Sequence, residues 1–178
     1  VLLGAVAGFA AVSWTDTALA WAPAACYGLA VALDYVDGAL ARHTDQESRL
    51  GARLDAEFDA LGVVAATAVG VTAGQVPVWF CAVGAAKYVY VAARRLRRWR
   101  DRPVYPLAGR ASRRVLAGLQ MAFLAAALTP AIAPEGAYAV APLVGLPYLL
   151  GFLRDWGQAS GRLPAAPTPP GPRGRPGG

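Results

Sequence analysis

Long apolar stretches alternate with short polar ones along the chain, and this pattern predicts an all-α fold. Six apolar segments stand out, and each is long enough for a full or partial transmembrane helix at about 20 residues per span. They cover residues 1–14, 18–41, 52–73, 77–96, 113–132 and 137–154. We therefore expect an all-α integral membrane protein with six transmembrane helices.

The first apolar segment is shorter than the others. About 13 residues precede Trp14, which gives roughly 20 Å of helix against a hydrocarbon core of about 30 Å. The chain also begins with Val1 and not with Met. We expect the chain to begin inside a truncated first span. Either an alternative start codon was used or upstream sequence is missing, and Val1 alone does not decide between these two explanations.

Composition agrees with a membrane protein. Of the 178 residues, 56% are hydrophobic and 16% are charged, which is unusual for a soluble domain of this size. We assign residues 1–156 to one membrane domain. The remaining residues, 157–178, are rich in proline, glycine and arginine, and we expect them to be disordered because they cannot form a packed element.

Basic residues are confined to one set of loops. All lysines and arginines except Lys87 fall in residues 42–53, in 94–114 or after residue 153, whereas the opposite loops contain none. By the positive-inside rule we place those loops and both termini on the cytoplasmic side of the membrane. We expect this membrane to be a bacterial cell membrane. The net charge of +6 is explained by anionic lipid, so we expect membrane lipids and no nucleic acid as partners.

Four aspartates gather on the cytoplasmic side of the second and third segments. Asp34 and Asp37 are followed by Gly38, Ala41 and Arg42, and then come Gly51, Asp55 and Asp59. The three- and four-residue spacings put two carboxylates on one face of each helix, beside residues that have almost no side chain. A loop near residues 43–50 brings the two faces together, so we expect the four carboxylates to converge there in a polar cavity.

This residue set suits a metal–phosphate site. Carboxylate oxygens are hard ligands for Mg²⁺ or Mn²⁺, which bridge to substrate phosphates. The small residues let a nucleotide approach the backbone, and Arg42 offers a planar, charged fork to phosphate oxygens. Aspartates inside a membrane helix are costly unless they face a water- or ion-filled site, which favours function over a solvated charge run.

Every fixed position of this motif matches the signature of the CDP-alcohol phosphotransferase (CDP-alcohol phosphatidyltransferase) family, which the chain resembles from its second span to about residue 153. The resemblance implies displacement of CMP from a CDP-linked donor by the hydroxyl of an alcohol. It implies that Asp34, Asp37 and Asp55 hold metal, and that Asp59 is the general base and also touches a metal. It further implies a homodimer and a nucleotide site, made by Gly38, Ala41, Arg42 and Gly51.

A second basic cluster bears on the acceptor. Lys87 lies near the depth of the aspartates, and Arg110, Arg113 and Arg114 open the fifth apolar segment. Similar clusters line the pocket in family members that use a phosphorylated acceptor, so these four residues are candidates for its phosphate. Two alternatives stay open: Lys87 snorkels to the interface, and the arginines simply follow the positive-inside rule.

The substrates are less defined than the reaction. The basic cluster favours transfer of a phosphatidyl group from CDP-diacylglycerol to glycerol phosphate or inositol phosphate, as a step of phospholipid synthesis. A neutral acceptor and a soluble CDP-alcohol donor remain open. Outside this class, the aspartates could serve a divalent-cation or proton-coupled transporter, although neither the inverted repeats nor the broken helices of such proteins are visible.

Overall fold

The computed structural model describes residues 19–43, 49–105, 107 and 111–164, and all regular elements in this part of the chain are helical. A short 3₁₀ helix, η2 (Leu19–Trp21), leads into α2 (Ala22–His43). A second 3₁₀ helix, η3 (Val78–Phe80), joins α3 (Arg49–Thr72) to α4 (Cys81–Trp99). The last two helices are α5 (Ala111–Ala127) and α6 (Pro134–Ala159).

The all-α prediction is confirmed for the described residues. Helices α2 to α6 correspond to the last five of the six predicted segments, and the first segment, 1–14, lies outside the described part. Within that part, α6 is the helix long and apolar enough to cross a membrane by length and composition. The count of six spans stays a prediction. Helix α6 ends at Ala159, and residues 165–178 of the expected tail are not described.

Local sequence explains where several helices begin and end. Helix α6 starts with Pro134, whose fixed φ suits the first helical turn, and Glu135 in that turn complements the positive end of the helix dipole. Helix α4 carries Arg97 and Arg98 in its last turn, where they complement the negative end of the helix dipole. After α3 the chain reverses at Gly74, whose φ of 71° favours glycine.

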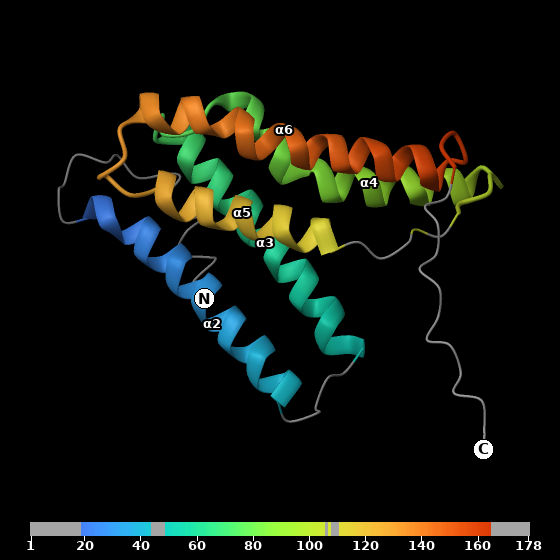
Figure 1. Ribbon diagram of the computed structural model, residues 1–178, viewed down its shortest axis with the longest axis horizontal. Coiled ribbons are helices and arrows are strands. Elements are labelled where there is room, and N and C mark those ends of the chain that lie inside the picture. The colour runs from blue at the N-terminus through green and yellow to red at the C-terminus, as the bar shows by residue number, and fades with distance from the viewer. Residues whose placement is uncertain (1–18, 44–48, 106, 108–110, 165–178) are drawn as a thin grey trace, which may run out of the picture.

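The helices form two groups joined by α5. Figure 1 shows α4 and α6 running side by side, with α2 and α3 slanting away from them. Helix α5 packs against α2, α3 and α6, and α3 also packs against α4. This arrangement brings α2 and α3 together next to α5, and the candidate aspartates lie on these two helices.

The core is apolar and closely packed around η3. Phe80 is fully buried and its ring lies 5.2 Å from that of Phe123 on α5. Helices α3 and α4 approach closely at Gly84, where an added Cβ would lie 3.4 Å from the Cα of Val64. The two helices therefore pack closely at Gly84, with space for little more than a methyl group.

Large apolar side chains also cover the outside of the bundle. On α6, Leu143, Leu150 and Leu153 are 74%, 63% and 65% exposed, and α2, α3 and α4 carry exposed leucines, valines and aromatic residues as well. Soluble monomers rarely expose apolar patches this extensive. The outer surface thus suits contact with lipid or with other protein chains.

We predict that Gly145→Ala destabilises the protein through the contact between α6 and η3. A Cβ at Gly145 would lie 2.9 Å from Trp79 and 3.0 Å from Phe80, and the overpacking is expected to cost about 1–3 kcal/mol. Gly118→Ala is the matched control, because nothing lies within 4 Å of a Cβ added at that position. Thermal unfolding in detergent should give a lower Tm for Gly145→Ala than for Gly118→Ala, and equal values would contradict the packing.

Candidate active site

One face of α2 carries the first acidic side chain of the site. Tyr27, Val31 and Asp34 recur at spacings of four and three residues, which places them on one side of the helix. Asp34 is partly buried, whereas Asp37, one turn further along, is exposed. The two carboxylates of this helix therefore lie in different environments.

Helix α3 supplies the facing acidic side chain. Asp59 is partly buried, and Phe58 and Gly62 lie beside it on the same wall of a small cavity. Because Gly62 has no side chain, the cavity has room at this wall one turn beyond Asp59. The third wall comes from Met121 on α5.

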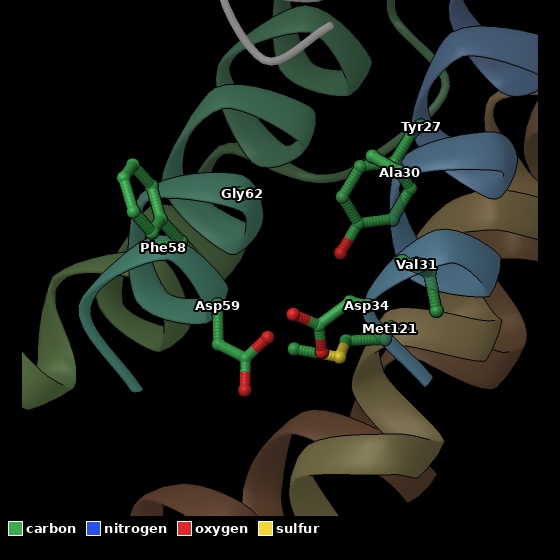
Figure 2. Close-up of a pocket in the computed structure, with 8 residues that line it drawn as sticks. All are labelled: Tyr27, Ala30, Val31, Asp34, Phe58, Asp59, Gly62 and Met121. Atoms are coloured by element: carbon green, nitrogen blue, oxygen red, sulfur yellow. The ribbon is translucent and has the colours of Figure 1, made fainter. Parts of the chain in front are cut away.

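The two aspartates face a common cavity of about 60 Å³. Figure 2 shows the carboxylates of Asp34 and Asp59 pointing toward one another across the space between α2 and α3. The rest of the lining is largely apolar, so electrostatic interactions of the two carboxylates are stronger here than in bulk water. Such a pair is most stable with a positively charged or hydrogen-bonding group between its members.

The remaining motif residues can be placed only in part. Gly51 is exposed in the first turns of α3. For Asp55 on α3, and for Gly38, Ala41 and Arg42 on α2, the helix is described but the side-chain positions are not, and Arg110 lies wholly outside the described residues. Convergence is therefore seen for two of the four predicted acidic ligands, and the assignments of the other motif residues stay predictions.

The described donor set fits a hard divalent cation that also binds substrate. No group of three or more histidine, cysteine or acidic side chains occurs among the side chains that the structure describes, and Asp55 is not one of these. Asp34 and Asp59 nevertheless offer carboxylate oxygens from two helices into one cavity. Mg²⁺ is commonly bound through one or two carboxylates together with substrate phosphates, so this pair matches such a cation in ligand type and number.

Two of the basic candidates for the acceptor site contact carboxylates. The Nζ atom of Lys87 lies 3.3 Å from Glu57 on α3. Arg113 of α5 approaches Asp155 of α6 through two atoms, with Nε at 2.8 Å from Oδ2 and Nη2 donating a hydrogen bond of 2.9 Å to Oδ1. Arg114 is exposed next to this pair. The phosphate-binding role of these residues stays a prediction.

Comparison with known proteins identifies the family of the chain. Residues 1–151 match the profile of the family described as CDP-alcohol phosphatidyltransferase. The chain belongs to this family. Neither the comparison with curated proteins nor that with solved structures found a match.

Membership in the CDP-alcohol phosphatidyltransferase family sets the reaction class. The family transfers a phosphatidyl group from a CDP-linked donor to an alcohol. The chain is therefore a transferase, of a kind that belongs to phospholipid synthesis. The family is membrane-associated and generally uses divalent metal ions. The resemblance inferred from the aspartate motif is thereby confirmed.

The structure adds three residues that the motif does not contain. Tyr27 lines the aspartate cavity, Glu57 contacts Lys87, and Asp155 contacts Arg113. The position of Tyr27 was accessible from the sequence, because it precedes Asp34 by seven residues, two helical turns on the same face. The two ion pairs link different helices, and nothing in the local sequence indicates them.

We predict that the contact between Arg113 and Asp155 stabilises the packing of α5 on α6. Asp155 is only 8% exposed, so Asp155→Asn should weaken a charge-assisted interaction worth about 1.5–3 kcal/mol. A double-mutant cycle with Arg113→Gln, followed by thermal or chemical unfolding, measures the coupling energy. Arg114→Gln, on the exposed neighbour, is the control and should show no coupling to Asp155→Asn. Additive effects of Arg113→Gln and Asp155→Asn would contradict the assigned role.

Proposed function

We propose that this chain transfers a phosphatidyl group from CDP-diacylglycerol to the hydroxyl of a small phosphorylated alcohol, such as glycerol phosphate or inositol phosphate, and releases CMP. The observation that carries the proposal is the convergence of Asp34 and Asp59, from two helices, on one cavity. Family membership supports the transferase over the transporter alternative.

The reaction exchanges one phosphorus–oxygen bond for another. The acceptor hydroxyl attacks the phosphorus that carries the lipid, a new phosphorus–oxygen bond forms, and the bond to the CMP oxygen breaks. The hydroxyl proton passes to a carboxylate oxygen of Asp59, which acts as the general base. Asp59 suits this role because its position on α3 is fixed by packing and its carboxylate faces the cavity.

The other acidic residues bind and orient the donor. Asp34, Asp37 and Asp55 would hold Mg²⁺ or Mn²⁺ together with Asp59, and the bound cation would neutralise charge on the diphosphate. Gly38, Ala41 and Gly51 leave room for cytidine, and Arg42 pairs with phosphate oxygens. These assignments rest on the motif, with the side-chain positions of Asp34 and Asp59 as structural support.

The choice of a phosphorylated acceptor rests on Lys87, Arg110, Arg113 and Arg114. In the structure, Asp155 orients the guanidinium of Arg113 at the start of α5, and Arg114 is exposed beside it. An arginine held by a carboxylate has fewer donors left for phosphate. This geometry favours Arg114 over Arg113 among the described candidates.

The proposed setting is a bacterial cell membrane, with the active site and both termini in the cytoplasm. The clustering of arginines in alternate loops supports this orientation, and the exposed leucines of α6 support contact with lipid. We also propose a homodimer, a property carried over from the family resemblance alone.

We predict that Asp59→Asn separates chemistry from donor binding. Loss of the general base should lower kcat by about 10²–10⁴-fold while the Kd for CDP-diacylglycerol stays close to that of the wild type. Asp34→Asn should instead weaken both Mg²⁺ binding and donor binding, because it removes a cation ligand. CMP release in detergent and equilibrium donor binding are the two measurements.

Glu57→Gln is the matched control for these variants. Glu57 lies on the same helix as Asp59 but contacts Lys87 and does not line the cavity. This variant should retain kcat and the Mg²⁺ requirement. If Asp59→Asn turns over at the wild-type rate in folded protein, Asp59 is not the base. An equal fall in donor affinity and in rate would make Asp59 chiefly a cation ligand.

We predict that one of Lys87→Gln, Arg110→Gln, Arg113→Gln and Arg114→Gln raises the KM for the phosphorylated acceptor and spares the donor KM. Loss of a charge-assisted contact of about 1.5–3 kcal/mol corresponds to roughly 10- to 150-fold in KM. An unphosphorylated analogue should respond little, because it already lacks the group that the cation binds.

Arg98→Gln, on the exposed end of α4, is the control for loss of one positive charge and should leave both KM values unchanged. If all four candidate variants keep the wild-type KM for every phosphorylated acceptor tested, these residues set the orientation of the protein in the membrane and do not bind the acceptor. A neutral alcohol then becomes the better acceptor.

A further inference from the structure

Tyr27 places a hydroxyl group in the aspartate cavity. Its side chain is 1% exposed and belongs to the apolar core, together with Val63 and Phe123. The same residue lines the cavity that contains Asp34 and Asp59. Figure 2 shows its oxygen directed toward the space where the two carboxylates meet.

This hydroxyl makes no hydrogen bond with any of the residues that the structure describes. A buried hydroxyl left without a partner costs about 1–3 kcal/mol, and phenylalanine would fill the same apolar space without that cost. A cavity of about 60 Å³ has room for one or two atoms or water molecules between the hydroxyl and the carboxylates. The position therefore calls for a polar occupant that accepts a hydrogen bond.

The carboxylates of Asp34 and Asp59 in the same cavity, when ionised, can only accept hydrogen bonds. Ionised carboxylates have no hydrogen to donate, whereas a tyrosine hydroxyl donates one. Tyr27 and Asp34 are two turns apart on α2, so the rigid helix fixes the distance between them. A donor held in this way restricts the rotation of a carboxylate that accepts from it.

We propose that Tyr27 is a positioning residue for the aspartate pair. Its hydroxyl donates a hydrogen bond to a water in the cavity, which in turn donates to a carboxylate oxygen of Asp34 or Asp59, and so holds the pair in the orientation that binds a divalent cation. The inference rests on the proposed function, in which both aspartates are cation ligands. Loss of such a supporting hydrogen bond typically weakens metal binding by about 10- to 100-fold.

The test measures Mn²⁺ binding to the purified protein in detergent, without substrates. Electron paramagnetic resonance detects the bound and free Mn²⁺. Tyr27→Phe keeps the buried ring and removes only the hydroxyl, so we expect a Kd for Mn²⁺ raised about 10-fold or more, with an unchanged or higher Tm. CMP release should fall at limiting Mn²⁺ and recover at saturating Mn²⁺. Tyr90→Phe is the matched control, because its hydroxyl is also buried, but the residue lines a groove between α4 and α6.

Three outcomes separate this inference from the proposed function. If Asp34→Asn abolishes Mn²⁺ binding but Tyr27→Phe binds Mn²⁺ like the wild type, the role of Tyr27 is overturned and the cation site stands. If the wild type itself binds no Mn²⁺, the cation site and the role of Tyr27 both fail. A fall in Tm for Tyr27→Phe with an unchanged Kd would make the hydroxyl a structural group only.

Discussion

The meeting of two like charges in an apolar cavity is the constraint on which the site depends. Asp34 and Asp59 face one another from different helices across a cavity whose other lining is largely apolar, and such a lining strengthens electrostatic interactions. The helix bundle must hold these two side chains close to each other. Packing of α2 and α3 against each other and against α5 supplies the restraint, and a cation between the carboxylates would attract both of them.

The second group of helices supports the first. Phe80 and Phe123 join η3 to α5, and the Arg113–Asp155 contact ties α5 to α6. Helix α5 packs against α6, and this contact helps to fix the place of α5. Met121 on α5 forms part of the cavity wall, so the contact also bears on the shape of the cavity. Residues far from the aspartates in sequence therefore set the cavity's shape, and small residues such as Gly84 allow the close helix contacts.

The sequence specifies the reaction class more clearly than it specifies the acceptor substrate. Carboxylates and small residues at fixed helical spacings specify a cation–diphosphate site, because ligand type and spacing are set by chemistry and by the helix repeat. Acceptor recognition depends on a few cations whose carboxylate neighbours decide how many donors remain for a ligand. Lys87 and Arg113 show this, since Glu57 and Asp155 engage them from other helices.

The sequence by itself determined the all-α fold, five of the helices that the structure describes, and the aspartate motif with its family, because apolar periodicity and residue spacing are local properties. Pairwise spacing also placed Asp34 and Asp59 on the correct helices. Only the tertiary structure showed that these two carboxylates face one cavity, that Tyr27 extends its hydroxyl into it, and that Asp155 contacts Arg113. Those relations depend on how helices pack, and packing brings together residues between which the sequence shows no periodic relation.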